Sequence, residues 1–414
     1  MIEILQEQQR AILVAVDTGE YDAAVSIDEL GELSETAGAV VLGKVIQKRP
    51  CADKATCVGS GMLEGIKAQA AALEANLLIF DQELTASQLR NIERETDLAV
   101  VDRTTLILDI FAQRARSREG KLQVELAQQK YRLPRLMGQG AALSRLGGGI
   151  GTRGPGESKL ESDRRHIRRR IESLERQLQD LERQRSLRRS RRKKDGIITA
   201  AIVGYTNAGK STLLNALTNA GVLAEDRLFA TLDPTARALT LPDGRTVMLI
   251  DTVGLIRRLP HQLVEAFHST LEEAADADLL LHVCDISSPE ADSQIEVTRR
   301  LLDELGCAQT PTVTILNKCD RLENLPASPG GGRVFVSAKT GYGLDRLLEA
   351  VAQTLPQSQL RMRLLLPYDK VALAAKIREN GRIFSEEYVP DGLLIDALAD
   401  RQITWELKPY LTDG

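Results

Sequence analysis

The fold of the central part of this 414-residue chain is decided by nine residues, Gly204-Tyr205-Thr206-Asn207-Ala208-Gly209-Lys210-Ser211-Thr212. They follow an apolar run at 198–203 that predicts a buried strand, and a helical pattern at 213–218 comes directly after them. Strand, glycine loop and helix in this order, with the spacing G-x-x-x-x-G-K-[ST], predict a P-loop that binds phosphate groups. The glycines let backbone amides surround the phosphates, Lys210 reaches the β- and γ-phosphates, and Ser211 offers its hydroxyl to Mg²⁺.

Two later segments follow apolar strands and indicate which nucleotide binds. The first is Asp251-Thr252-Val253-Gly254, where Asp251 can hold Mg²⁺ and the Gly254 amide can meet the γ-phosphate. The second is Asn317-Lys318-Cys319-Asp320, an N-K-x-D pattern typical of GTPases. Asp320 can accept hydrogen bonds from the guanine N1 and N2 protons, which adenine does not offer, so the site favours GTP over ATP. A further strand ends in Ser337-Ala338-Lys339, whose backbone would support the guanine ring.

A segment between these motifs predicts a loop that closes on the nucleotide. It reads Phe229-Ala230-Thr231-Leu232-Asp233-Pro234-Thr235. Thr231 is placed to close over Mg²⁺ when the γ-phosphate is present, although the segment alone also fits an ordinary polar loop. We expect Lys210, Thr231 and Gly254 to serve hydrolysis. We expect Mg²⁺ to be held by Ser211, Thr231 and Asp251.

The part of the chain before the P-loop predicts two further units. Residues 1–103 alternate short apolar runs (11–16, 39–42, 76–80 and 98–101) with helical patterns, which predicts a parallel α/β domain. A Gly59-Ser60-Gly61 turn precedes one helix, and we interpret it as structural because no acidic partner for a ribose follows. Residues 196–356 predict a P-loop GTPase domain with a mixed, mostly parallel sheet. Residues 357–414 predict a small α+β domain.

Residues 104–195 predict an antiparallel helical hairpin. One helical pattern runs from Thr104 to about Arg132 and is interrupted by Pro134. A second helix is predicted from Arg164 to Lys194, with apolar residues at the spacing of a heptad seam. The seam consists of Ile167, Ile171, Leu174, Leu178 and Leu181, and we expect it to face Leu122, Leu126 and Leu133. A glycine-rich stretch at 138–156 would form the tip.

Charge is concentrated in this hairpin. From Arg153 to Lys194 there are 16 Lys/Arg and 7 Asp/Glu, a net charge of +9, so the rest of the −4 chain carries −13. Such asymmetry indicates a polyanionic partner, and the run of basic residues at 188–194 is suited to contact phosphates. Two other interpretations stay open, a flexible linker for the glycine-rich tip and a solvated coiled-coil face for the helix.

Composition excludes several classes of protein. Hydrophobic residues are 43% and charged residues 27%, as in globular proteins, and aromatic residues are only 3%, which argues against a surface of stacked rings. The five cysteines and four histidines show no metal-binding spacing, so we expect reduced, packed thiols in a cytoplasmic protein. The start is polar and no apolar run is long enough to span a bilayer, although membrane association stays open.

The motifs resemble those of the HflX GTPases. The similar segments are F-A-T-L-D-P-T at 229–235, D-T-V-G at 251–254, I-R-R-L-P-H-Q-L-V-E-A-F at 256–267 and G-G-I-G-T-R-G-P-G-E at 148–157. The resemblance covers nearly the whole chain. It implies a cytosolic GTPase that binds the large ribosomal subunit and splits stalled or idle ribosomes. It also implies contact with ribosomal RNA, for which the loop from Gly148 to Glu157 and the helix from Arg164 to Lys194 are suited, and no DNA partner.

The sequence departs from the family pattern at two positions. Leu255 stands where the family has Phe, and neither residue can orient water as the glutamine of Ras-type enzymes does, so we expect slow hydrolysis that the ribosome stimulates. Met62 replaces an expected lysine after Gly61. Asn207 matches a K⁺-coordinating asparagine of related GTPases, although it also fits a residue that only braces the loop.

Two other functions are compatible with these patterns. The first is an RNA-remodelling protein, a function that also predicts use of ATP through the N-terminal domain. The second is a GTP-gated regulator of another protein. We expect a monomer, because the heptad seam can be satisfied within one chain.

Overall fold

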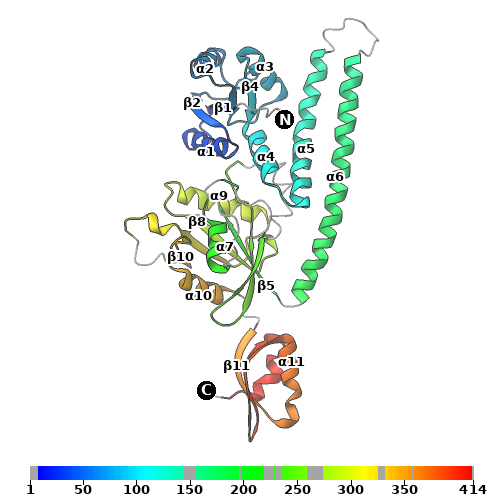
Figure 1. The fold of residues 1–414 in the computed structure, drawn as a ribbon, viewed down its shortest axis with the longest axis vertical. Helices are drawn as coiled ribbons and strands as arrows, with labels where there is room; N and C mark the ends of the chain where they lie inside the picture. The colour runs from blue at the N-terminus through cyan, green and yellow to red at the C-terminus, as the bar shows by residue number, and fades with distance from the viewer. Residues whose placement is uncertain are drawn as a thin grey trace, which may run out of the picture.

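A computed structural model gives the structure of the chain. It describes residues 8–143, 155–194, 197–218, 228–229, 235–258, 274–324, 332–355 and 359–412. Figure 1 shows an α/β domain, a long helical hairpin beside it, a second α/β domain and a small unit at the C-terminus. Most of the glycine-rich tip lies outside the described residues, as does Thr231 with its neighbours at 230–234.

The N-terminal domain is built on a four-stranded parallel sheet in the order β2-β1-β3-β4. Its strands are β1 (Arg10–Asp17), β2 (Val40–Lys48), β3 (Leu77–Phe80) and β4 (Ala99–Asp102). The connecting helices are α1 (Ala23–Thr36), α2 (Ser60–Leu73) and α3 (Ala86–Thr96). One apolar core lies on the side of α1 and α4 (Arg103–Arg114), and another lies on the side of α2 and α3. The parallel α/β fold expected from the alternating runs is confirmed.

The structure corrects the expected first helix of the hairpin. Two helices replace it, α4 and α5 (Arg118–Leu143), because Ala115 turns to an extended conformation and the Ser117 hydroxyl accepts the Gly120 amide at the start of α5. Pro134 lies inside α5, so the expected interruption was wrong. A proline costs the helix one hydrogen bond, and the packing of α5 against α3, α4 and α6 outweighs that loss.

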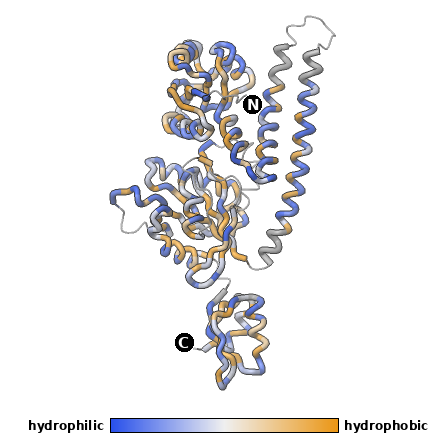
Figure 2. Tube along the Cα trace, in the orientation of Figure 1, coloured by the Kyte–Doolittle hydropathy of each residue, from blue (hydrophilic) through white to orange (hydrophobic). Residues whose placement is uncertain are grey.

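The hairpin itself is antiparallel, as expected (Figure 1). Helix α6 (Pro155–Lys194) starts earlier than Arg164, and Pro155 at its first turn is well suited to begin a helix. Leu122 and Leu126 of α5 pack on Leu174 of α6, together with other members of the seam. Figure 2 shows that the coloured middle part of α6 is mostly hydrophilic, with a few apolar positions. No described helix is both long and apolar enough to cross a membrane.

The GTPase domain has a six-stranded sheet in the order β10-β9-β8-β5-β7-β6, in which only β6 runs antiparallel to its neighbour. Its strands are β5 (Ile198–Gly204), β6 (Thr235–Thr240), β7 (Thr246–Asp251), β8 (Leu279–Asp285), β9 (Thr312–Asn317) and β10 (Arg333–Phe335). Its described helices include α7 (Lys210–Thr218), α9 (Ala291–Glu304) and α10 (Leu344–Thr354). Ligands of such sheets bind at the carboxyl ends of the parallel strands, which is where the predicted motifs lie.

The C-terminal unit is an antiparallel sheet in the order β11-β13-β12 with helices on one face, as expected for an α+β domain. It contains β11 (Gln359–Leu366), α11 (Ala372–Asn380), β12 (Gly381–Val389), β13 (Gly392–Asp400) and α12 (Arg401–Leu407). Arg382 donates to the Gly244 carbonyl oxygen of the β6–β7 turn over 3.1 Å. A Cβ at Gly244 would lie 2.6 Å from the Phe384 ring, so β12 packs closely on the GTPase domain.

Candidate nucleotide-binding site

The P-loop joins the end of β5 to the start of α7, and its backbone requires glycine at two positions. Gly204 has a φ of +153°, and a Cβ there would lie 2.2 Å from the Val283 carbonyl oxygen. Gly209 has a φ of +93°, and a Cβ there would lie 2.3 Å from the side-chain nitrogen of Asn317. Asn207 is also left-handed, with a φ of +59°. The loop is therefore held in a conformation that ordinary side chains disfavour, as is common at ligand sites.

Lys210 lies buried at the first position of α7, with 7% of the residue exposed. Its Nζ donates to the carbonyl oxygens of Tyr205 at 2.7 Å and of Gly204 at 3.2 Å. Burial lowers the pKa of Lys210 to about 8, and the nearby Asp251 carboxylate opposes part of this effect. A phosphate next to the ammonium would favour its charged form, so the site is electrostatically suited to an anion.

The Asp251–Gly254 segment lies directly on the P-loop. Thr206 donates its amide to the Leu255 carbonyl oxygen at 2.8 Å, and Leu255 donates its amide to the Gly204 carbonyl oxygen at 3.0 Å. A Cβ at Gly254 would lie 3.1 Å from Lys210 Nζ and 3.0 Å from the Thr206 Cα. Only glycine therefore fits between the two loops, and its position is next to the lysine that would bind the phosphates.

The two segments expected to bind guanine, 317–320 and 337–339, are connected to the P-loop by Asn317, which is 2% exposed. Its side chain donates to the Ala208 carbonyl oxygen at 2.8 Å and accepts the Ala338 amide at 3.0 Å. Asp320 lies at the surface, where a hydrogen bond from Ser337 is the main cause that lowers its pKa. It is thus ionised at neutral pH and suited to accept protons from a base.

Asp285 is a residue of this site that the sequence analysis missed. It ends β8, and its carboxylate lies 2.7 Å from Lys318 Nζ, with both side chains 15% exposed. Lys318 has a φ of +61°, and the ion pair orients its side chain over the edge of the sheet. An aspartate directly after an apolar strand, as in 279–285, was the signal available in the sequence.

Comparison with known proteins gives three matching family models along the chain. They are described as "GTP-binding GTPase N-terminal" over residues 24–112, "GTP-binding GTPase Middle Region" over 114–192 and "50S ribosome-binding GTPase" over 199–318. GTPase HflX of Caldanaerobacter subterraneus subsp. tengcongensis is 52% identical over 412 residues, which cover 99% of this chain and 95% of that protein. GTPase HflX of Escherichia coli K12 is 40% identical, with 93% and 92% covered. The chain belongs to the HflX family of GTPases.

HflX membership confirms the resemblance seen in the motifs and the expected enzyme class, hydrolysis of GTP to GDP and phosphate. The P-loop GTPase fold, a mixed and mostly parallel sheet, is confirmed as well. Among solved structures, a GTP-binding protein from Sulfolobus solfataricus in complex with GDP is 27% identical, with a TM-score of 0.44, over 84% of this chain and 98% of that one.

The chain has a carboxylate and a hydroxyl suited to Mg²⁺. Ser211 at the start of α7 donates to Asp251 Oδ2 at 2.8 Å, and Asp251 is fully buried at the end of β7. Hard oxygen ligands beside a phosphate site fit this ion, so these residues can hold it. Thr231, the third expected ligand, is not among the described residues.

The loop before Thr231 is described only at Leu228 and Phe229. Phe229 is 2% exposed and has a φ of +55°. Its ring meets the Phe111 ring of α4 edge-on, with centroids 4.6 Å apart. Phe229 is therefore packed on the N-terminal domain, a contact between domains that the sequence patterns did not indicate. Ala230, Leu232 and Asp233 stay predictions.

The Gly59–Gly61 turn is occupied by structural contacts. The Gly59 amide donates to the Gln47 side chain at 2.9 Å, and a Cβ at Gly59 would lie 2.9 Å from Arg49. Gly59 also caps the start of α2. These contacts agree with the structural interpretation of the turn.

Proposed function

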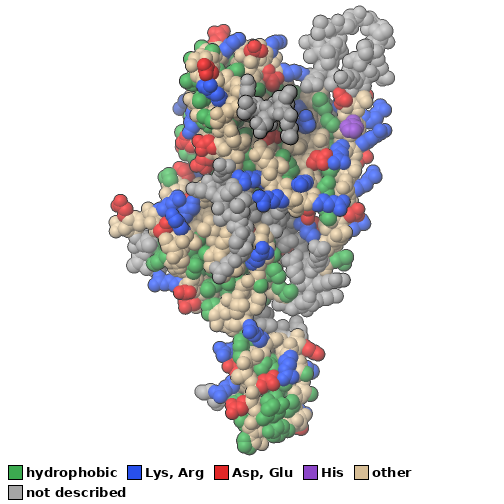
Figure 3. Space-filling view, viewed as in Figure 1, with side chains coloured by type: hydrophobic (Ala, Val, Ile, Leu, Met, Phe, Trp, Pro, Cys, Tyr) green, Lys and Arg blue, Asp and Glu red, His purple; other side chains and the backbone are tan. Residues whose placement is uncertain are grey.

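We propose that this HflX-family chain is a monomeric cytoplasmic GTPase switch that binds the large ribosomal subunit and splits or rescues stalled or idle ribosomes. The observation that carries the proposal is a cationic helix attached to a GTPase domain. On α6, Arg165, Arg168 and Arg169 are exposed, and they form no ion pair with other described residues. Figure 3 shows basic side chains along the hairpin. Such side chains contact phosphates of RNA without reading its sequence.

The hairpin is suited to present these arginines. Arg170 and Lys130 form ion pairs across α5 and α6 with Glu125 and Glu175, which hold the helices together. The face of α6 that points away from α5 then keeps its positive charge for a partner. The family model that covers 199–318 is described as a "50S ribosome-binding GTPase", which supports the large subunit as that partner.

At the nucleotide site, the chain's own residues bind and orient the substrate. Asp320 would accept the guanine protons, the Lys210 ammonium would bind the β- and γ-phosphates, and the Gly254 amide would meet the γ-phosphate. Mg²⁺ bound by Asp251 and Ser211 would neutralise phosphate charge. Leu255 is 3% exposed and apolar, so it cannot orient the attacking water. Hydrolysis by the isolated chain should be slow, and docking on the ribosome should accelerate it.

We also propose that K⁺ binds beside the P-loop at Asn207, where the positive φ places the residue in a strained turn. K⁺ would add positive charge beside the phosphates. Turnover in KCl should exceed turnover in NaCl at equal ionic strength. Equal rates in the two salts would show that Asn207 only stabilises the conformation of the P-loop.

The main test measures GTP turnover and binding with purified large ribosomal subunits. Turnover should rise severalfold with subunits, and binding should weaken steeply as salt increases. The combined substitution Arg165→Gln, Arg168→Gln and Arg169→Gln should reduce binding by about tenfold or more while turnover without subunits is unchanged. The control replaces Arg299, Arg300 and Arg346, which are exposed on α9 and α10, with Gln. No rise in turnover together with no binding would refute the ribosome as partner.

A second candidate, remodelling of free RNA, is favoured by a cleft of about 900 Å³ between the N-terminal domain and the hairpin. Its lining includes Arg90, Arg132 and His166, which could contact a single strand. This function predicts turnover that naked RNA stimulates as strongly as subunits do. A regulator of another protein would show stimulation by neither.

A further inference from the structure

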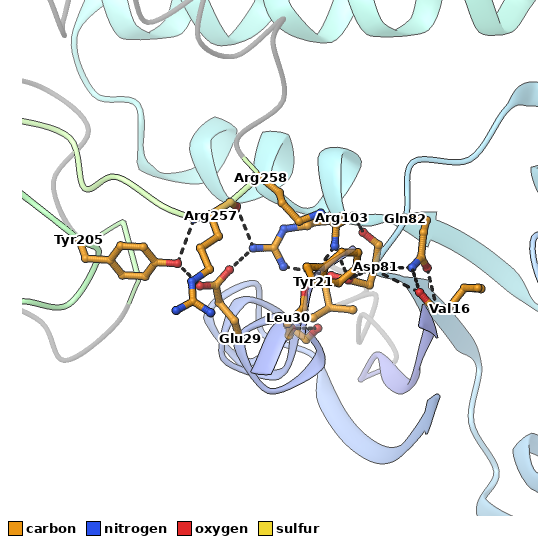
Figure 4. Close-up of polar contacts among 12 residues, drawn as sticks. Val16, Tyr21, Glu29, Leu30, Asp81, Gln82, Arg103, Tyr205, Arg257 and Arg258 are labelled. Carbon is orange, nitrogen blue, oxygen red and sulfur yellow. Dashed lines mark hydrogen bonds and ion pairs between the residues drawn. The ribbon is translucent and has the colours of Figure 1, made fainter. Parts of the chain in front are cut away.

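A polar cluster joins the N-terminal domain to the two loops that surround the phosphate site. It consists of Glu29 on α1, Asp81 after β3 and Arg103 on α4, which meet Tyr205 and Arg258 of the GTPase domain (Figure 4). The Tyr205 hydroxyl donates to Glu29, and Arg258 donates to Asp81. Tyr205 is the second residue of the P-loop, and Arg258 follows Gly254 by four positions. The cluster is thus in direct contact with the nucleotide-binding loops.

Two guanidinium groups, those of Arg103 and Arg258, contact the buried carboxylate of Asp81. Arg103 contacts both Glu29 and Asp81, and its side chain is 3% exposed, while those of Asp81 and Glu29 are 0% and 12% exposed. Burial alone would raise the pKa of Asp81, but Arg258 and Arg103 outweigh it and hold the pKa below its usual value. Withdrawal of Arg258 would leave Asp81 with Arg103 alone, which it shares with Glu29, and a buried carboxylate that loses a cation is costly.

Neutral groups also stabilise the position of the Arg258 side chain. Its guanidinium lies 4.2 Å above the Tyr21 ring, and the Tyr21 and Ser26 hydroxyls donate to Asp81 at 3.1 and 2.8 Å. The backbone of Arg258 has a φ of +53°, a conformation that costs free energy for a residue with a side chain. The contacts with Asp81 and Tyr21 compensate for that cost, so the conformation of this segment depends on the N-terminal domain.

The segment between Leu255 and Arg258 is held at both ends. Leu255 is paired with the P-loop backbone, as described above. The Arg257 amide donates to the Tyr205 hydroxyl at 2.9 Å, and Arg103 donates to the Arg257 carbonyl oxygen at 3.3 Å. Gly254 directly precedes this segment, so the cluster constrains the amide that would meet the γ-phosphate.

Apolar packing connects the same loops to the same domain. Val253, Ile256 and Phe229 belong to one buried core with residues of α1 and α4, including Phe111. Ile256 is fully buried there. A movement of either loop would therefore disturb the core of the N-terminal domain as well as the polar cluster.

We propose that Glu29 and Asp81 are positioning residues of the GTPase site, which act through Tyr205 and Arg258 to hold Gly254 near Lys210 and so favour GTP over GDP. The inference rests on the nucleotide-binding part of the proposed function. Only GTP has the γ-phosphate that Gly254 would contact, so free energy that holds Gly254 in place adds to the binding of GTP alone. By reciprocity, the γ-phosphate strengthens the contact between the domains.

The test compares the affinities of GDP and a non-hydrolysable GTP analogue for the full chain without ribosomes. In Asp81→Asn and Glu29→Gln the preference for the analogue should fall by about 5- to 10-fold, with GDP affinity nearly unchanged. Tyr205→Phe, which removes only the hydroxyl, should act in the same direction. Its combination with Glu29→Gln should cost less than the sum of the two single changes, because the Tyr205–Glu29 contact is affected by both.

The matched control is Asp28→Asn. Asp28 is the neighbour of Glu29 on α1, and it forms an exposed ion pair with Lys44 at 2.6 Å. The same chemical change there should leave the preference unchanged. If Asp81→Asn does not fold, the Tyr205→Phe and Glu29→Gln pair decides the question.

Hydrogen exchange supplies a readout that a merely structural role would not affect. In the unmodified chain, amides of α1 and α4 should exchange more slowly with the analogue than with GDP, and Glu29→Gln should abolish the difference. Folded variants with an unchanged nucleotide preference would overturn the inference alone. If the unmodified chain binds neither nucleotide, the proposed site fails and the inference fails with it.

Discussion

Asn317 of the N-K-C-D segment donates its side-chain amide to the Ala208 carbonyl oxygen of the P-loop, 2.8 Å away and 109 positions earlier in the chain. The same side chain accepts the amide of Ala338, which precedes Lys339. One buried amide therefore connects the loop suited to phosphates with both segments suited to guanine. The halves of the site that are expected to bind the base and the phosphates are thus joined through this side chain.

Asn317→Asp should uncouple these halves. The new oxygen would face the Ala208 carbonyl without a proton to share, and a buried polar group without a partner costs about 1–3 kcal/mol. We expect the affinities for GDP and for a GTP analogue to fall together, by about tenfold or more. Calorimetric titration with each nucleotide measures this effect. An unchanged GDP affinity would show that the P-loop keeps its shape without this hydrogen bond.

Nucleotide binding should depend on pH through Lys210. Burial lowers its pKa to about 8, and a bound phosphate would raise that pKa again. Above pH 8 the free site has therefore lost the lysine proton, and binding must take it up. We expect affinity for GTP analogues to fall from pH 7.5 to 9.5, and proton uptake to appear in calorimetry in buffers of different ionisation enthalpy. Lys210→Arg, which does not titrate in this range, should show neither trend.

His282 should make stability sensitive to mild acid. It lies on β8 with 5% exposure, and burial is the main cause that lowers its pKa to about 4, with Arg299 and Lys210 adding to the effect. The unfolded chain binds the proton near pH 6.5 and the folded chain only near pH 4. Stability is therefore full above about pH 7 and is lost as the pH falls through this window, by about 2 kcal/mol at pH 5.

Urea unfolding of His282→Gln at pH 7.5 and pH 5 measures this contribution, because the variant should lose less stability between the two pH values than the unmodified chain. His166→Gln, at an exposed position of α6, is the control and should leave the pH dependence unchanged. Equal pH dependence of all three proteins would show that His282 titrates normally.

Gly204 should tolerate no side chain. An alanine there would need a φ of +153° and would place its Cβ 2.2 Å from the Val283 carbonyl oxygen, so β5 and β8 would have to separate. We expect Gly204→Ala to lose about 2–4 kcal/mol in thermal unfolding. Gly65→Ala, in the middle of α2 with open space around its Cβ, should instead gain up to about 1 kcal/mol. If Gly204→Ala had the same melting temperature as the unmodified chain, the steric requirement for glycine at this position would be contradicted.

Local patterns in the sequence predicted most of the secondary structure and the type of fold. Apolar runs such as 11–16 and 198–203 are fully or largely buried strands, because a parallel sheet is covered on both faces. Pro134 misled the prediction, since the loss of one hydrogen bond is a local effect and the packing of α5 on three helices is not. The P-loop and N-K-x-D segments could be recognised because each consists of consecutive residues with a characteristic spacing.

Contacts between domains could not be predicted in this way. Glu29 and Tyr205 lie 176 positions apart, and no sequence motif contains both residues. Their contact depends on how two separately formed sheets pack, which no periodicity encodes. Asp285 is an intermediate case. Its position at the end of a strand can be predicted from the sequence. Its ion pair with Lys318 can be predicted only when it is known that β8 and β9 are neighbours in the sheet.

Helix α6 has a mechanical consequence. It contains 40 residues, about 60 Å of helix at 1.5 Å per residue, and ends at Lys194, shortly before β5 begins at Ile198 and runs to the P-loop. A rotation of β5 that α6 followed would therefore be amplified by the length of the helix. A tilt of roughly 5° at that strand displaces the far end of α6 by roughly 5 Å. That displacement is about the pitch of one helical turn, so a small rotation at the start of the GTPase sheet would become a large movement at the other end of α6.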